Sequence, residues 1–326
     1  EIGTGDWSSD VCSSDLRVLA TGVGGVPRRA FGCSTGHTLM CWDAKHPHHL
    51  ALPRAVGPYT VMRATKRVQL STIANIIGTY KTGNARGDAG NWSRMCLLSD
   101  TNSSNPINAV SNAQINVLPL TDIGRAATMC PSALSVQIMC PTALQTASGI
   151  VYAGVMNTQA KIAGRPDTWS EYMDKFVQFQ SPRLLAAAKL ALRGVQIDSY
   201  PLNMSEVSSF SQLTQTGAGV VTLDAETYNP EGWAPIVIYN PSGVTLELLI
   251  TVEYRVRFDL DNPASASHTH HPIASDSVWD KLTRQAASLG NGVKDIADVV
   301  ANTGMAVGRA MAVTDRVANA GRLMIA

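Results

Sequence analysis

The sequence predicts a mainly β protein built as a sandwich of antiparallel sheets. Three observations support this fold class. About eight strand-like segments are separated by turn residues, helical segments are inserted only in the middle of this series, and strands and helices do not alternate regularly. A doubly wound parallel sheet would require that alternation, because its strands are joined by crossover helices.

The first sixteen residues differ from the rest of the chain. The run from Asp6 to Leu16 resembles the translation of a sequencing-library adapter, and residues 1–16 contain no Lys or Arg. We therefore interpret residues 1–16 as an adapter-derived artefact and exclude them from the fold. The chain has 26 basic and 25 acidic residues, and four of the acidic residues lie in this stretch, so the remainder carries a charge of +5.

Residues 17–55 are rich in Gly, Pro and His and show no hydrophobic periodicity, which predicts an extended N-terminal arm. We expect the natural N-terminus to lie upstream, with a basic stretch before Arg17, because a charge of +5 is too small to neutralise a packaged nucleic acid. Arg28 and Arg29 are either the remnant of that basic stretch or an ordinary solvated pair.

The cysteine pattern argues against a disulfide-linked protein, and the hydropathy argues against a protein with membrane-spanning helices. No Cys-x-x-Cys pair occurs, and the odd number left after residue 16 is typical of free, buried thiols in a reducing compartment. These cysteines are Cys33, Cys41, Cys96, Cys130 and Cys140. No stretch has 18 consecutive apolar residues, so a membrane-spanning helix is not expected.

The first group of predicted strands alternates with loops over residues 56–156. The strand-like segments are 59–65, 73–80, 95–98, 113–120, 134–139 and 150–156. Residues 82–91 and 99–112 are predicted loops because they are polar and rich in turn-forming residues. Pro131, Pro141 and Gly149 are expected to separate strands.

Two helices are predicted in the middle of the chain. Asp167 or Thr168 begins a sequence typical of a capping box, and aromatic residues follow at helical spacing. Residues 182–192 predict a second helix that ends at Gly194. Its expected apolar stripe consists of Leu184, Leu185, Ala188 and Leu192.

Strands are predicted again at 195–200, 220–223, 234–239 and 245–258, with a polar stretch over 205–218. The last segment has the strongest pattern, since apolar side chains occupy every second position from Leu246 to Val256. Period two over a dozen residues predicts a half-buried strand. The shell domain is therefore expected over residues 56–260, followed by a linker at 261–275 and an amphipathic helical tail at 276–326.

Several segments between residues 50 and 280 resemble the coat proteins of noda-like and tombus-like positive-strand RNA viruses, including members found by environmental sequencing. They are 52–59 (LPRAVGPY), 149–154 (GIVYAG), 181–184 (SPRL), 188–195 (AKLALRGV), 200–204 (YPLNM) and 252–258 (VEYRVRF), the last continuing to Asp261-Asn262-Pro263. The resemblance implies an eight-stranded antiparallel jelly-roll β-sandwich, and the residue patterns above add inserted helices and a helical C-terminal tail to it. It also implies self-assembly of identical subunits around genomic RNA.

The sequence offers few candidate site residues. Arg17, Arg28 and Arg29 are the candidates for contact with RNA, by phosphate neutralisation. His46, His48 and His49 and then His268, His270 and His271 form two clusters, for which a surface or pH-sensitive subunit contact is favoured over zinc. The oxygen-rich segment 259–262 is either a solvated turn or a calcium site between subunits; no metal or cofactor is otherwise expected.

These observations favour a structural capsid subunit of an icosahedral virus, located in the virion and assembled in the host cytoplasm. No enzymatic activity is expected, because the chain has no hydrolase elbow, phosphate loop or dinucleotide fingerprint. The tail is a candidate for membrane contact. The alternative is a soluble, lectin-like β-sandwich binding module.

Overall fold

The computed structural model describes residues 42–45, 57–81, 92–108, 113–118, 127–162, 165–202, 208–215, 221–223, 233–271, 284 and 292–296. Arg17, Arg28 and Arg29, the first histidine cluster, the predicted loop at 82–91 and most of the tail lie outside these residues.

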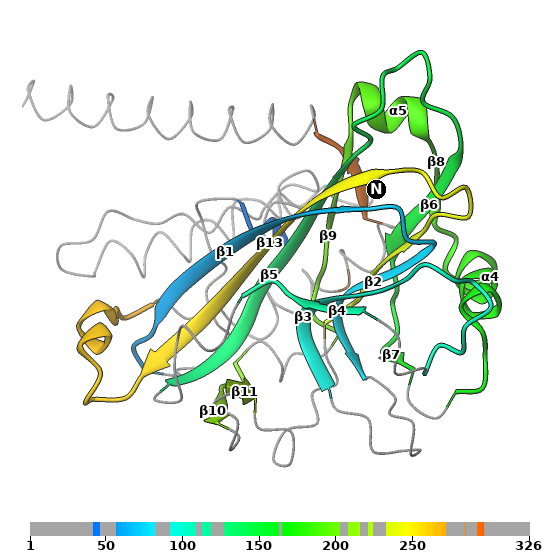
Figure 1. Cartoon of the computed structure of the whole chain (residues 1–326). Coiled ribbons are helices and arrows are strands. Elements are labelled where there is room, and N and C mark those ends of the chain that lie inside the picture. Colours follow the sequence, from blue (N-terminus) through cyan, green and yellow to red (C-terminus); the bar gives the residue numbers. More distant parts are fainter. Residues whose placement is uncertain are drawn as a thin grey trace, which may run out of the picture.

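Long antiparallel strands form the first sheet, which has seven strands in the described part of the chain (Figure 1). Its order is β1-β13-β5-β10-β11, with β9 on β5 and β14 on β9. The strands are β1 (Thr60–Leu70), β5 (Ala127–Met139), β9 (Val195–Asp198), β10 (Ser211–Gln215), β11 (Val221–Leu223), β13 (Leu246–Phe258) and β14 (Val293–Asp295). β13 lies between β1 and β5 and pairs with both along its length.

The second sheet also has seven strands among the described residues, in the order β4-β3-β2-β12-β6-β8, with β7 on β2. They are β2 (Ala74–Lys81), β3 (Trp92–Asp100), β4 (Ala113–Asn116), β6 (Ile150–Val155), β7 (Ala160–Lys161), β8 (Arg183–Ala186) and β12 (Ile236–Tyr239). All pairs are antiparallel except that of β2 with β7. The prediction of a mainly β protein with antiparallel sheets is therefore confirmed, with more strands than the eight expected.

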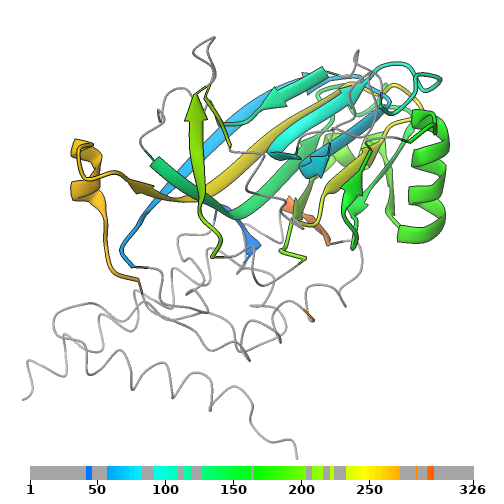
Figure 2. The ribbon, with the colours of Figure 1, turned by 90° about the horizontal axis from the view of Figure 1, so that it is seen from below.

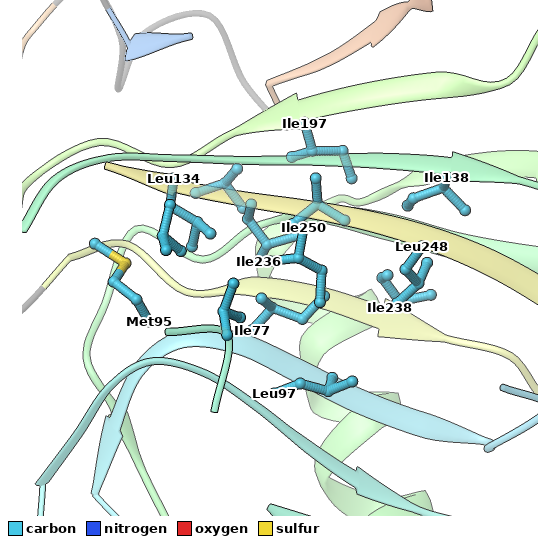
Figure 3. Close-up of a cluster of buried hydrophobic side chains, with 14 of the residues drawn as sticks. Ile77, Met95, Leu97, Leu134, Ile138, Ile197, Ile236, Ile238, Leu248 and Ile250 are labelled. Atoms are coloured by element: carbon cyan, nitrogen blue, oxygen red, sulfur yellow. The ribbon is translucent and has the colours of Figure 1, made fainter. Parts of the chain in front are cut away.

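The core lies between the two sheets, where alternate side chains of each strand meet. Figure 3 shows Leu134, Ile138, Leu248 and Ile250 of the first sheet facing the labelled apolar residues of the second, among them Ile77, Leu97, Ile236 and Ile238. Each is completely buried. Burying one such side chain contributes about 1.5–3 kcal/mol, so this layer is the main source of stability.

Pro131 does not separate strands as expected but lies inside β5. The pairing of β5 with β13 shifts there, since Glu253 pairs with Ala133 and Tyr254 with Pro131, leaving Ser132 as an extra residue. Such a bulge accommodates a proline because a residue there does not need to donate to the ladder. β5 therefore extends well before the predicted start at residue 134.

The first predicted helix is confirmed as α4 (Trp169–Gln180), with Thr168 as its N-cap. The backbone N–H of Glu171 donates to the Thr168 hydroxyl, and the backbone N–H of Thr168 donates to the Glu171 carboxylate. α4 packs on the outer face of the second sheet, where its buried residues form a second apolar cluster. They are Trp169, Tyr172, Met173 and Phe176.

The second predicted helix is wrong in its first half. The segment Arg183–Ala186 is strand β8, paired with β6, and only Ala187–Leu192 is helical, as α5. Pairing with β6 overrides the local helical spacing at Leu184, which is exposed. Leu192 is also exposed, although it lies on α5. Gly194 ends the helix as predicted, with a φ of +61° and its N–H donating to the Leu190 carbonyl.

Two further segments differ from expectation for the same reason. The polar stretch at 205–218 contains β10, which pairs with β5 and β11. Val293–Asp295, expected within the helical tail, forms β14 and pairs with β9. β5 and β9 lie far away in the sequence from β10 and β14, so local composition does not reveal these pairings.

Candidate functional site

The outward face of β13 is polar and yet largely buried, contrary to the prediction of a half-buried strand. Glu253 and Arg255 are 2% and 1% exposed, and Thr251 is 1% exposed. The Glu253 carboxylate accepts hydrogen bonds from Arg63 Nη2 and Ser132 Oγ, each at 2.8 Å. A buried carboxylate requires such partners, because removing a charge from water is otherwise costly.

The four described residues of the predicted arm are packed against the first sheet and the core. Trp42 is 2% exposed, and its ring meets that of Trp233 edge-on, with centroids 6.1 Å apart. The backbone N–H of Ala44 donates to Ser135 Oγ at 2.8 Å, and Lys45 Nζ donates to Gln137 Oε1 at 2.5 Å. Residues 42–45 are thus part of the folded body.

A segment from the other end of the chain reaches the same region. β14 pairs with β9, and Lys294 Nζ contacts the carboxylate of Asp198 on β9. Arg183 Nη1 donates to the Val293 carbonyl at 3.1 Å, and Lys189 forms an ion pair with Asp295 at 2.9 Å. In Figure 2, residues 42–45 and β14 both lie on the lower side of the sheet containing β1, β13 and β5.

Two buried carboxylates meet where these segments join, at what we term the Asp43–Asp198 junction. Ser135 Oγ donates to Asp198 Oδ1 at 2.6 Å and lies 3.4 Å from Asp43 Oδ1. Gln196 Nε2 also donates to Asp198 Oδ1, at 2.9 Å. A hydroxyl has one proton to donate, so the shorter bond to Asp198 leaves Asp43 without a donated proton from Ser135.

The environment of the junction shifts the pKa of Asp43 upward. Burial raises the pKa of Asp43, and the negative charge of Asp198 raises it further, although the N–H of Lys45 and the charge of Lys294 act in the opposite direction. A protonated Asp43 can itself donate to Ser135 Oγ. Burial also lowers the pKa of Lys45. The pKa values of Asp43 and Lys45 are thus shifted in opposite directions, each toward the neutral form of the side chain.

One end of the sandwich exposes large apolar side chains. Of the seven exposed large hydrophobic residues in the described part of the chain, five lie on the end of β5, the turn after it, β6, β8 and α5. They are Met139, Leu144, Ile150, Leu184 and Leu192, which we call the apolar end. The backbone connects these elements: Ile150 pairs with Ala186, and the N–H of Cys140 donates to the Leu190 carbonyl.

The second histidine cluster lies at the opposite end, beside the 3-10 helix η3 (Pro263–Ser267) that follows β13 (Figure 1). The backbone N–H of Phe258 donates to His268 Nε2 at 2.9 Å, and the His271 ring stacks on Tyr59 with centroids 3.8 Å apart. His270 is exposed. His268 and His271 thus contact other residues of the same chain. The proposed role of the cluster in a subunit contact stays a prediction.

The candidate metal ligands at 259–262 act as a turn and a cap here. Asp259 and Asp261 are exposed, and Asn262 Oδ1 accepts from the N–H of Ala264 at 3.0 Å at the start of η3. Among the described residues, no three His, Cys, Asp or Glu side chains are grouped to hold a metal ion. Calcium binding between subunits therefore remains a prediction.

Two further expectations concern cysteines and membranes. Cys96, Cys130 and Cys140 are buried thiols, as predicted, whereas Cys33 and Cys41 lie outside the described residues. In the part of the chain that the structure describes, no helix has the length and apolar character needed to cross a membrane.

The comparisons with known proteins gave structural likenesses alone. No family model and no curated protein matches the chain. The decameric BFDV capsid protein is 10% identical, covering 61% of this chain and 98% of its own, with a TM-score of 0.28. The structure of infectious bursal disease virus Gx strain is 7% identical, covering 79% and 96%, with a TM-score of 0.40. Mud crab tombus-like virus is 11% identical, covering 70% and 89%, with a TM-score of 0.28. These three TM-scores are all below 0.5, so the likenesses do not establish a function.

Proposed function

We propose that this chain is a structural capsid subunit that assembles with identical copies into a closed icosahedral shell around single-stranded RNA. The observation that carries the proposal is the apolar end, where five large apolar side chains are exposed at one end of an otherwise well-packed sandwich. Clusters of this kind mark surfaces that another protein covers.

The strand connections support the same function. Four strands of each sheet, β1-β13-β5-β9 and β2-β12-β6-β8, have the neighbours expected of a jelly roll. This architecture is common in virus shells. In a closed shell, each contact is repeated by symmetry, so contacts that are individually modest give a stable assembly.

The placement of the terminal segments supports RNA enclosure. Residues 42–45 and β14 lie on one side of the first sheet (Figure 2), so the described part of the arm is held on that side. If this side faces the interior, Arg17, Arg28 and Arg29 enter the compartment that holds the genome. They would neutralise phosphates without reading sequence.

The test compares assembly of the chain with that of the double variant Leu184→Glu and Leu192→Glu. The matched control is Leu260→Glu, because Leu260 is equally apolar and 94% exposed but lies beside η3, away from the apolar end. In sedimentation velocity we expect the parent chain and the control to form large particles and the double variant to remain small. A parent chain that stays monomeric at high concentration, as a lectin-like module would, contradicts the proposal. Unchanged assembly of the double variant contradicts the role of the apolar end.

A further inference from the structure

Strand β8 lies at the edge of the second sheet. In the described part of the chain it pairs with β6 alone, so its other side is a free edge. Figure 1 shows β8 at the end of the sandwich that also carries α5. Leu184 is 58% exposed and Ala186 is also exposed, whereas Leu185 between them is buried in the core. The strand is therefore accessible from solvent at the two residues that flank Leu185.

The hydrogen bonds to β6 show which backbone groups of β8 are directed to the free edge. The N–H of Ala187, which follows the strand, donates at 3.0 Å to the carbonyl of Gly149, which precedes β6. Backbone groups alternate in direction along a strand, so those of Leu185 also face β6. The N–H and C=O groups of Leu184 and Ala186 point the opposite way. A strand edge of this kind is a template on which another strand can pair.

The charges differ between this edge and the edge of the first sheet. β1 is the edge strand of the first sheet and carries Arg63 and Arg67, both exposed, and charged side chains are one way in which proteins keep strand edges apart. Positions 184–186 carry no charge. The neighbouring Arg183 donates to the Val293 carbonyl of its own chain. Two copies can therefore approach along β8 without like charges facing each other, which they cannot do along β1.

The outward side chains of β6 and β8 form an apolar strip beside the free edge. The register places Leu184 beside Tyr152 and Ala186 beside Ile150. Ile150 is 44% exposed and Tyr152 is half-buried. If two β8 strands pair antiparallel about Leu185, Leu184 of one copy lies opposite Ala186 of the other. A large side chain then meets a small one, and both lose exposed apolar area.

We propose that β8 pairs antiparallel with β8 of a second copy across a two-fold axis, so that the second sheets of two subunits become one continuous sheet. With the axis at Leu185, Leu184 of each chain exchanges both backbone hydrogen bonds with Ala186 of the other. The contact then has four hydrogen bonds, two from each exchange. This inference rests on the proposed function and deepens it, since it states how the apolar end meets a second copy.

Ala186→Pro tests the pairing without removing a hydrogen bond to β6. Ala186 has a φ of −75°, close to the value that proline requires, and its N–H points away from β6. The substitution removes two of the four expected bonds, so association measured by sedimentation should weaken about thirtyfold. The matched control is Ala186→Ser, which keeps the N–H and should change association by less than about threefold.

Disulfide trapping gives a second readout that does not depend on a proline being tolerated. Opposite residues of a hydrogen-bonded antiparallel pair have Cα atoms about 5.5 Å apart, which is within the range of a disulfide. Chains with Leu184→Cys are mixed with chains with Ala186→Cys, oxidised mildly and analysed by mass spectrometry. We expect a disulfide between positions 184 and 186 of different chains. In the control, Leu260→Cys replaces Ala186→Cys, because Leu260 is 94% exposed but lies beside η3, and no disulfide to it is expected.

The outcomes separate this contact from the proposed function. Particles that form without the 184–186 disulfide, or equally well with Ala186→Pro and Ala186→Ser, would overturn the inference and leave the capsid function standing. Disulfides from position 184 to β4, the opposite edge of the second sheet, would also overturn it, because they indicate head-to-tail pairing. A disulfide-linked pair that never forms particles would support the β8 contact and contradict the shell. A chain that stays monomeric contradicts both.

Discussion

Replacing Trp42 with alanine tests whether the segment 42–45 belongs to the folded body. Trp42 is 2% exposed and packs edge-on against Trp233. A buried tryptophan removes about 150–250 Å² from water, which at about 25 cal/mol per Å² corresponds to about 4–6 kcal/mol. Measured Trp→Ala substitutions in cores cost about 3–5 kcal/mol, partly because a cavity remains. Since domains are stable by about 5–15 kcal/mol, Trp42→Ala should remove a large part of the free energy of unfolding.

The assay is urea unfolding followed by circular dichroism, on subunits kept below the concentration at which they assemble. Phe179→Ala is the control, because Phe179 is an aromatic residue on α4 that is 71% exposed. We expect the control to change the free energy of unfolding by no more than about 0.5 kcal/mol. If Trp42→Ala costs less than about 1 kcal/mol, or no more than the control, then residues 42–45 are not anchored as the structure shows.

Three other substitutions test the junction, a turn and a cap. Because the pKa of Asp43 is raised in the folded state, its contribution is present at low pH and is lost as the pH rises through that raised value. Asp43→Asn should therefore stabilise the chain relative to the parent more at pH 8 than at pH 5 in urea unfolding, and equal destabilisation at both pH values would contradict this. Gly194→Ala should destabilise by about 1–3 kcal/mol, because an added Cβ would lie 2.7 Å from Ile296 Cδ1 at a φ of +61°, and an unchanged melting temperature would refute that strain. Thr168→Ala should cost about 1 kcal/mol through loss of the N-cap of α4, and an unchanged unfolding midpoint would show that this cap does not contribute.

Local patterns in the sequence identified the elements that local chemistry determines. The period-two pattern at 245–258 predicted β13 to within one residue. Successive side chains of a strand point to opposite faces, so a strand with one face in the core has apolar residues at every second position. The capping box predicted the start of α4, because its hydrogen bonds join residues only three positions apart. β8 was missed because its strand conformation depends on pairing with β6, which local helical spacing does not reveal.

The Asp43–Asp198 junction could not be predicted from the sequence, for a related reason. Asp43, Asp198 and Lys294 come from three distant parts of the chain, and only the register of β9 with β5 and β14 brings them together. One signal pointed toward it. Trp42 is a large apolar residue within a Gly- and Pro-rich stretch, and such a residue is usually covered. The charged residues that alternate along the strongest strand predicted an exposed face instead, because charged side chains are rarely buried.

Negative-stain electron microscopy of the recombinant chain tests shell formation most directly. We expect closed particles of uniform diameter that protect RNA from nuclease. A single monomeric species, at high concentration and with RNA present, would contradict the assignment as a capsid subunit.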